Sequence, residues 1–503
     1  MARDNGGIIG VTNNPTSSTA TGVWSIESQY QARVGDTWPQ RALFTTKSAR
    51  FNSGSTDSLD RTPSSSGNGT TFTMSMWLKR SGLGGTHLIY KAKGSAQTEF
   101  TLAFNSDKLQ VYQVNSGGAQ EAAIKTLSVQ RDISAWYHAC IQIQTADGTA
   151  TDRCKIYING VQQTIDSSGT DAYSSSFNTG VNQASYKQEI GGAASPYGGY
   201  MAEFVMIDGS ILAPTEFAEA DEDSGIWKPK SVSGLTFGTN GFYQEYKQSG
   251  TGTDSSGMGA DTSGNDNHFA VNNLTAIDQS TDTCTNNFAT WNSLIKTTAT
   301  FSEGNLKYAQ PGSNPVFGSL STIGVTSGKW YAELNYTSGS SHKLVLGVAD
   351  ETFQNGNTTA SYDLGKSGTT SSIAYVVNTG AYRINNSNTS WGSAGGDGQI
   401  IMWAIDKVNN KIYFGVNGVW GASSNPASNS GGIPTTALDS STSWFIGCTN
   451  DTGSTETVAQ FNFGSPPYAI SSSNADANGY GNFEYAVPSG YYALNTANLA
   501  EFG

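Results

Sequence analysis

The chain has 503 residues, more than a single hydrophobic core usually organises, so two or three domains are expected. Its net charge of −13 at pH 7 would repel a phosphate backbone, which argues against nucleic-acid binding. Only 13% of the residues are charged, whereas 59 are glycine and 11% are aromatic, and this composition favours short strands and tight turns over long helices.

Residues 1–40 are predicted to form an extended arm. The segment lacks the apolar core of a secretory signal. No run of about 18 apolar residues occurs in the chain. We therefore expect synthesis in a cytoplasm, without membrane insertion. Trp24, Tyr30 and Trp38 are more aromatic surface than so short a segment can bury by itself. They are candidate contacts either with the first folded domain or with a partner protein.

Residues 41–228 contain strand-like runs in which apolar and polar residues alternate, separated by polar turns. The runs are Phe72–Leu78, Glu99–Phe104, Lys108–Val114, Trp136–Ile143 and Cys154–Ile158. The last two are expected to form a hairpin. Asn159-Gly160 is expected to turn the chain again, because Asn-Gly favours the left-handed angles of tight hairpins. A period of two with frequent turns predicts a β-sandwich.

The order of these segments resembles laminin-G-like jelly rolls of the concanavalin type. The matching segments are 72–79 (FTMSMWLK), 136–138 (WYH), 155–160 (KIYING) and 202–208 (AEFVMID). The resemblance implies two stacked antiparallel sheets and a short helix after the last strand, which residues 213–219 fit. It also implies a structural role for His138.

The cysteines show no spacing typical of a disulfide framework or of a metal site; they are Cys140, Cys154, Cys284 and Cys448. Alternation places Cys140 and Cys154 on opposite faces of one sheet, which disfavours a bond between them. All four are expected to be reduced.

Residues 229–296 are predicted to be a connector with one or two short strands between 237 and 246. The loop Asp254–Asn267 superficially suggests a calcium site, but Met258 and Asn265 occupy positions where an EF-hand needs oxygen ligands. A turn-rich loop and a calcium or sodium site of another kind both stay open. Residues 272–291 resemble a connector in structural proteins of marine phages.

Residues 297–470 are predicted to form a second sandwich. Its strand-like segments are 328–334, 344–349, 400–406, 411–416, 443–448 and 459–464. Their order resembles a SPRY domain, through the Lys-Trp-Tyr-x-Glu strand, the Gly-Val-Ala strand and the hairpin that ends at Asn417-Gly418. The fold class is therefore all-β: two tandem concanavalin-like jelly rolls with an N-terminal arm and a short C-terminal tail, residues 471–503. The tail aromatics are expected to pack on the second sandwich.

No residue pattern predicts catalysis, a cofactor or a metal site, so a non-enzymatic protein is expected. None of the four histidines lies within metal-ligand spacing of another histidine or of a cysteine. Glycosidases of the concanavalin fold need two carboxyl groups on one groove, and the closest match is 219–223 (EADED). That segment follows the predicted helix and is not expected on a strand, so a solvated acidic turn is predicted.

Binding is then the expected activity. In the second sandwich, Tyr382, Asn385, Trp391 and Trp420 place aromatic and amide groups on predicted loops, which suits contact with a sugar or a protein. Trp391 and Trp420 are equally compatible with a place in the core.

The N-terminal segments 6–10 (GGIIG), 15–18 (PTSS) and 22–26 (GVWSI) resemble the start of marine phage tail fibres and related virion proteins. The resemblance implies a homotrimeric tail fibre or receptor-binding protein on the virion. Its arm would bind other virion proteins, and its sandwiches would contact a glycan or protein on the host surface. Alternatives are a capsid decoration or head-fibre protein, a bacterial adhesin, which the missing secretory signal disfavours, and a polysaccharide depolymerase.

Overall fold

The computed structural model describes residues 14–16, 20, 24–34, 44–94, 97–167, 171–192, 194–222, 224–295, 299–311, 318–338, 344–354, 364–366, 371–450 and 456–503. It divides into two units, Met1–Phe44 and Thr45–Gly503, and each is described by itself. No helix in these ranges is long and apolar enough to span a membrane.

The N-terminal unit contains helix α1 (Ile26–Val34), which lies inside the segment that the sequence predicted to be an extended arm. Ser25 starts the helix, because its hydroxyl accepts a hydrogen bond from the Ser28 backbone at 3.1 Å. The Gln29 side chain donates to the Trp24 carbonyl at 3.2 Å, so the residue before the cap is also held.

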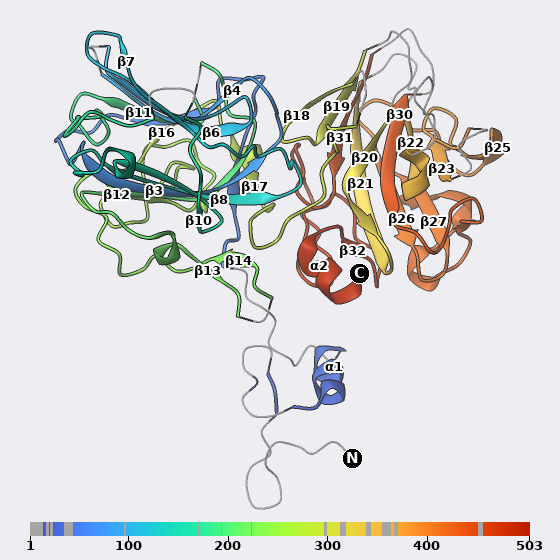
Figure 1. Cartoon of the computed structure of the whole chain (residues 1–503). Coiled ribbons are helices and arrows are strands. Elements are labelled where there is room, and N and C mark those ends of the chain that lie inside the picture. Colours follow the sequence, from blue (N-terminus) through green and yellow to red (C-terminus); the bar gives the residue numbers. More distant parts are fainter. Residues whose placement is uncertain are drawn as a thin grey trace, which may run out of the picture. The chain divides into compact units, whose positions relative to one another are not determined.

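Two antiparallel sheets form the first sandwich (Figure 1). One sheet has the order β10 (Val161–Gln162), β9 (Cys154–Ile158), β8 (Trp136–Gln144), β3 (Thr71–Arg80), β12 (Gly199–Asp208), β1 (Ser48–Phe51) and β17 (Gln279–Ser280), with β15 (Phe242–Gln244) beside β12. The other has the order β16 (Ala270–Asn272), β2 (Ser58–Arg61), β11 (Lys187–Ile190), β4 (Thr86–Lys93), β5 (Glu99–Asn105), β6 (Lys108–Val114) and β7 (Gln120–Lys125).

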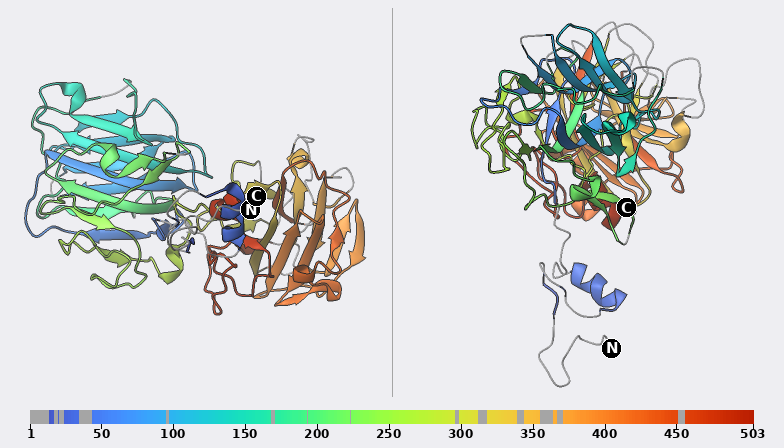
Figure 2. Two further views of the ribbon diagram at one scale, coloured as in Figure 1. Left: turned by 90° about the horizontal axis from the view of Figure 1, so that it is seen from below. Right: turned by 60° about the vertical axis from the view of Figure 1, so that its left-hand side comes forward.

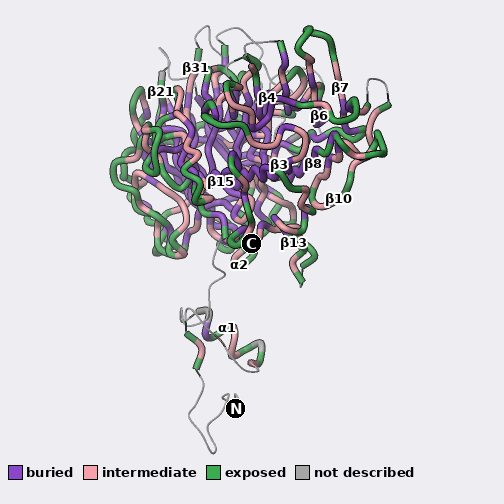
Figure 3. The backbone as a smooth tube through the Cα atoms, turned by 90° about the vertical axis from the view of Figure 1, so that its left-hand side faces the viewer, coloured by how far each residue is buried: buried purple, intermediate pink, exposed green. Residues whose placement is uncertain are grey.

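The central strands of the first sheet are buried on both faces: every residue of β12 is buried, and so are nine of the ten residues of β3 (Figure 3 labels β3). Their inner face packs into the core between the sheets. Their outer face is covered by the hairpin β13 (Ala218–Ala220) and β14 (Trp227–Pro229) and by the chain leading to it. The helix expected at 213–219 is a single 3₁₀ turn, Pro214–Glu216.

The predicted connector is not a separate linker, because its strands complete the first sandwich. β15 pairs with β12, β16 pairs with β2, and β17 pairs with β1. The sequence boundary near residue 228 therefore falls inside the first sandwich. These strands are only two or three residues long, too short to show a period of two.

The second sandwich also has two sheets. The first contains β18 (Thr300–Ser302), β19 (Lys307–Gln310), β31 (Thr457–Asn462), β21 (Lys329–Ser338), β26 (Ile400–Asp406), β27 (Lys411–Val416) and β28 (Val419–Trp420), with β29 (Ile433–Pro434) on β27. The second contains β20 (Ser319–Val325), β30 (Trp444–Asn450), β22 (Leu344–Asp350), β23 (Ser372–Val376), β24 (Ala381–Ile384) and β25 (Ser387–Ser390). Other single 3₁₀ turns are Ala150–Asp152, Ala276–Asp278, Glu351–Gln354, Gly421–Ser423 and Pro426–Ser428.

The C-terminal tail folds onto the second sandwich (Figure 2). Strand β32 (Tyr492–Ala493) lies parallel to β21, and helix α2 (Thr496–Phe502) follows it. The buried carboxylate of Glu333 accepts hydrogen bonds from the backbones of Glu484 and Tyr485, both at 2.8 Å. The expected packing of tail aromatics is confirmed, since Tyr491 is buried against this sheet.

Both predicted Asn-Gly hairpins are confirmed. Asn159 and Gly160 have φ of 49° and 79°, and Asn417 and Gly418 have φ of 47° and 83°, as a tight type I′ turn requires. The four cysteines are free. Cys154 lies in the core between the sheets and Cys140 on the outer face of its sheet.

Hydrogen bonds join the first sandwich to the segments that follow it. The Tyr200 hydroxyl donates to the Gly304 carbonyl at 3.0 Å. The Asn52 amide donates to the Glu303 carboxylate at 2.7 Å. Because both sandwiches belong to one compact unit, these bonds fix the segment that carries β18 and β19 against the first sandwich.

Candidate functional site

A polar groove crosses the outer face of the second sheet of the first sandwich. It has a volume of about 390 Å³ and is lined by Thr62, Lys91, Lys93, Gly94, Ser185, Lys187 and Glu189. Strand alternation produces it: in β4 the side chains of Tyr90 and Ala92 are buried in the core, so those of Lys91 and Lys93 point outward. Glu189 and Lys187 of β11 stand directly opposite them.

The lysines of the groove are held by carboxylates. Lys91 and Lys93 lie 2.8 and 3.0 Å from Glu99, and Lys187 lies 2.6 Å from Asp60. Partial burial acts to raise the pKa of Glu99, but hydrogen bonds from Lys91 and Lys93 outweigh it and leave that pKa below its usual value. Glu99 is therefore a charged acceptor at neutral pH and is poorly suited to donate a proton.

In the groove, the ammonium groups of three lysines, which are hydrogen-bond donors, lie beside carboxylates, which are acceptors. Lys93 and Lys187 have side chains about half exposed, at 55% and 51%, so their ammonium groups are accessible to a ligand. Because each lysine already has a carboxylate partner, the groove carries little net charge. Such an array suits a ligand with many hydroxyl groups, each of which both donates and accepts.

This groove was not predicted from the sequence. Lys91, Lys93, Lys187 and Glu189 alternate along their strands, but neither segment was among the predicted strands. The groove forms only when β11 pairs with β4 across about ninety intervening residues. The alternation of residues within one strand does not predict which distant strand it pairs with.

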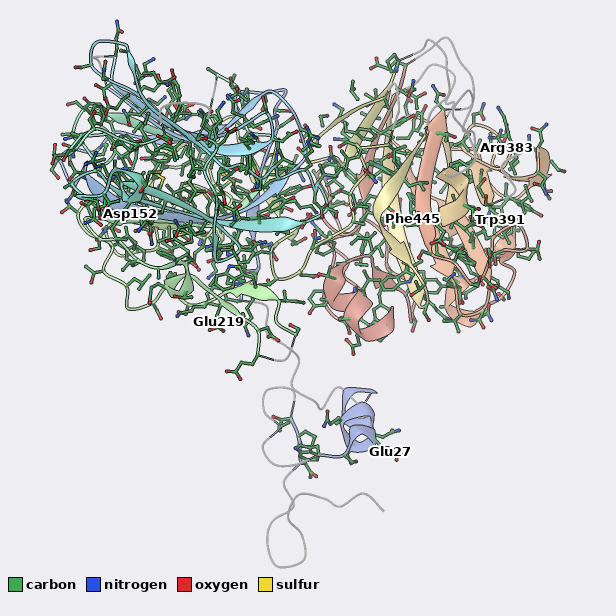
Figure 4. The ribbon with its side chains drawn as sticks, viewed as in Figure 1. Glu27, Asp152, Glu219, Arg383, Trp391 and Phe445 are labelled. Atoms are coloured by element: carbon green, nitrogen blue, oxygen red, sulfur yellow. The ribbon has the colours of Figure 1, made fainter. Side chains whose placement is uncertain are left out.

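The four predicted ligand contacts do not form one surface. Trp391 is 9% exposed, and its indole donates to the Phe414 carbonyl at 3.0 Å, so it belongs to the core of the second sandwich (Figure 4). Tyr382 packs edge-on against it at 5.9 Å. Asn385 is exposed at the turn between β24 and β25, where its φ of 48° is left-handed.

Trp420 lies in a different cluster from Trp391. Its half-buried ring contacts Tyr331 and Tyr413 on the outer side of the first sheet of this sandwich, at 6.3 and 6.5 Å. Of the four residues, Asn385 is the most accessible to a ligand.

The predicted attachment residues of the arm are only partly described. Trp24 is half-buried in the N-terminal unit. Tyr30 lies on α1, but its side chain is outside the described part, and so is Trp38.

Asp261 organises the loop Asp254–Asn267 by hydrogen bonds to backbone groups inside the loop and on β15. The Asp261 carboxylate accepts hydrogen bonds from the backbones of Tyr243, Ser263 and Asn267 at 2.8 to 2.9 Å. Nowhere in the described ranges do three His, Cys, Asp or Glu side chains gather as a metal site needs. In this structure the loop is a turn held by Asp261.

The acidic segment at 219–223 differs from the prediction in one respect. Glu219 lies on the short strand β13, not in a turn, although its side chain is 51% exposed (Figure 4). Asp221 pairs with Lys228 at 2.9 Å, and that hydrogen bond lowers the pKa of Asp221. The hairpin partner Lys228 therefore neutralises part of this acidic run.

His138 is fully buried on the outer face of β8. Its ring accepts the Trp227 indole N–H at 3.1 Å and contacts the Ser75 hydroxyl at 2.8 Å. It also packs against Trp77 with ring centroids 5.1 Å apart. Burial lowers the pKa of His138 to about 3, so it stays neutral and holds the β13–β14 hairpin.

Comparison with known proteins identifies the first domain. Residues 53–214 match the Laminin_G_3 family, described as the concanavalin A-like lectin/glucanases superfamily. The first sandwich thus contains a concanavalin-like domain. No curated protein matches the chain.

Solved structures similar to the chain include two kinds of β-sandwich. The SPRY domain of human HERC1 is 13% identical over 34% of this chain and 96% of its own, with a TM-score of 0.27. A native heptameric SAP-like pentraxin from Limulus polyphemus is 14% identical over 39% of this chain and 100% of its own, with a TM-score of 0.26. At these scores the likeness adds nothing to the fold, which rests on the sheets themselves.

Proposed function

We propose that the protein is a virion structural protein of a tailed phage, a tail fibre or receptor-binding protein, whose first sandwich binds a glycan of the host surface. The groove carries this proposal, because it is a preformed hollow of about 390 Å³ lined by accessible donors and acceptors on a rigid sheet. The phage assignment is supported by the resemblance of the N-terminal segments and the 272–291 segment to marine phage proteins.

The architecture suits this role. The charged groove residues Lys91, Lys93, Lys187 and Glu189 stand on the paired strands β4 and β11, so the backbone that carries them loses little conformational entropy when a ligand binds. Residues 1–44 form a unit of their own, which leaves the larger unit free to carry recognition while the arm attaches to the particle. In this proposal the assembled fibre is a homotrimer.

Adsorption measurements test the proposal. Purified full-length protein is added to host cells before phage infection, and free phage are counted over time. The proposed function predicts that saturating protein slows adsorption at least tenfold, because it occupies the receptor. Unchanged adsorption with protein shown to be folded would contradict it.

Cryo-electron microscopy of the virion gives a second, independent check. The proposal places the sandwiches at the distal end of a tail fibre, with residues 1–44 toward the particle. Density for this chain on the capsid surface would instead establish a decoration or head-fibre protein. Release of reducing ends from purified host polysaccharide would establish a depolymerase.

A further inference from the structure

A buried lysine, an asparagine and an aspartate meet where the first sandwich ends. Lys79 lies on β3 and is 1% exposed. Its Nζ is 2.6 Å from Oδ1 of Asn287 and 2.7 Å from Oδ2 of Asp282, whose side chain is also 1% exposed. The Phe288 carbonyl, at 3.1 Å, completes the three acceptors of the ammonium group.

Aromatic residues cover the buried pair of Lys79 and Asp282, while Asn287 is partly buried. Across the sheet, Lys79 stands between Trp136 of β8 and Tyr200 of β12. The Trp136 indole donates to Oδ1 of Asp282 at 3.0 Å, and Nζ lies 5.5 Å from the centre of the Tyr200 ring. Trp136 and Tyr200 are 9% and 0% exposed. A buried charge pair in such surroundings carries a desolvation penalty that a neutral product would not.

We propose that Lys79 and Asn287 form an intramolecular isopeptide bond, with Asp282 as the proton carrier. An amine in contact with an amide carbonyl in a fixed orientation has a high effective concentration for attack. The contact between Nζ and Oδ1 places the Asn287 carbonyl within reach, and Asp282 touches the same nitrogen. The leaving nitrogen Nδ2 donates to the Ser134 carbonyl at 2.6 Å, which fixes the orientation of the amide.

The reaction balances without any co-reactant. Asp282 takes one proton from the Lys79 ammonium, and the free amine attacks Cγ of Asn287. Asp282 returns the proton to Nδ2 as the Cγ–Nδ2 bond breaks, and ammonia leaves. Of the three hydrogens on the ammonium, one stays on the new amide, one leaves on ammonia, and one remains on Asp282 or departs as ammonium ion. Nothing is oxidised or reduced.

The bond would tie together two distant parts of the chain. Lys79 and Asn287 are 208 residues apart, and Asn287 lies two residues before Ala289, which is in the core of the second sandwich. A covalent link here would fix the central strand β3 to the start of the second sandwich. Such a link closes a long loop and limits the unfolded state as a disulfide does, but it cannot be reduced.

Intact mass spectrometry of the purified full-length protein tests the proposal. The bond predicts a mass below that of the sequence by the mass of ammonia, about 17 Da. After trypsin digestion, it predicts a branched peptide joining the segments around Lys79 and Asn287. The full sequence mass, or a linear peptide ending at Lys79 in most of the protein, would overturn the proposal.

The variant Lys79→Arg is the matched control. Arginine keeps the buried positive charge, but its guanidinium does not attack an amide. Its mass should show no loss of ammonia once the substitution is counted. A loss that persists in this variant would come from a succinimide at an Asn-Gly pair such as Asn159-Gly160, and would refute the bond. Circular dichroism confirms that the variant is folded, and the branched peptide of the unaltered protein is decisive without it.

Discussion

At the scale of single residues, Glu203 combines a buried carboxyl group with a left-handed backbone. It sits at an irregularity in the pairing of β12 with β3, and its φ of 51° is left-handed. Its carboxyl accepts a hydrogen bond from the Tyr243 hydroxyl. Burial raises the pKa of Glu203 to about 7. A non-glycine residue in that region of φ and ψ stores local strain, which the surrounding sheet must hold.

This raised pKa predicts a pH-dependent stability. The folded state binds a proton at Glu203 more tightly than the unfolded state does. Protonated Glu203 therefore contributes fully to the free energy of unfolding below about pH 4.5, and this contribution is lost as pH rises through 7. Glu203→Gln stays neutral, so we expect it to be more stable than the unaltered protein by about 2–3 kcal/mol at pH 8 and nearly equal at pH 4.5. Urea unfolding at the two pH values measures the difference.

Glu219→Gln is the control for this comparison, because the Glu219 side chain is 51% exposed. Its stability should follow the pH profile of the unaltered protein. If Glu203→Gln also followed that profile, the carboxyl would not be titrating as the burial implies.

At the scale of elements, hairpins with an Asn-Gly turn depend on the glycine. Gly160 has φ of 79°, and a Cβ there would lie 2.7 Å from the Trp227 ring. Gly84 has a similar φ of 70°, but a Cβ there would meet nothing within 4 Å. Gly84→Ala should therefore cost about 1 kcal/mol of backbone strain. Gly160→Ala should cost about 2–3 kcal/mol, because it also displaces Trp227.

Denaturant unfolding of the two alanine variants separates these effects. Equal losses would mean that Trp227 moves aside freely and that the packing of the β13–β14 hairpin on this turn contributes little. A larger loss for Gly160→Ala would show that the hairpin is tightly held.

Alternation of apolar and polar residues predicted the strands correctly where the strands are long and end in an Asn-Gly turn. It correctly predicts β8, β9 and the two Asn-Gly turns, because a period of two over five to nine residues leaves little ambiguity. It misses β16 and β17, which have three and two residues, since too few positions exist to show a period. It also misses α2. The sequence contains a helix cap at Asn495 and helix-forming Ala, Leu and Glu residues, but the helix has only seven residues.

The candidate site shows the same limit. Aromatic and amide residues on predicted loops directed attention to Tyr382 and Trp391, yet Trp391 fills the core. The groove depends on the pairing of β11 with β4, which brings Lys187 opposite Lys93. Register between distant strands is set by the global fold, so single-sequence alternation could not reveal it.

At the scale of the whole molecule, buried charges join the two sandwiches. Arg50 on β1 is fully buried, and its guanidinium donates to the carbonyls of Ile277 at 2.8 Å and Pro466 at 3.3 Å. It also lies 3.8 Å from Asp278 and 3.8 Å from Glu303. Arg50 therefore holds the segment at residues 277–303 and the segment at Pro466 against the first sandwich.

Arg50→Ala should uncouple the sandwiches. Removing the buried guanidinium leaves two carbonyls and the partly buried carboxylates of Asp278 and Glu303 without their cation, at a cost of about 2–3 kcal/mol. In scanning calorimetry the unaltered protein should unfold residues 45–503 in one transition, whereas the variant should show a lower and split transition. A single transition at unchanged temperature would show that Arg50 does not couple them.

The proposed function depends on binding of the host surface by the groove of the first sandwich. The direct test measures binding of fluorescently labelled full-length protein to host cells, with Lys93→Ala/Lys187→Ala compared with the unaltered protein. Lys155→Ala, on β9 outside the groove and also paired with an acid, Asp152, is the control. We predict at least a tenfold loss of affinity for the double variant and none for Lys155→Ala. Equal binding by all three proteins would contradict the account.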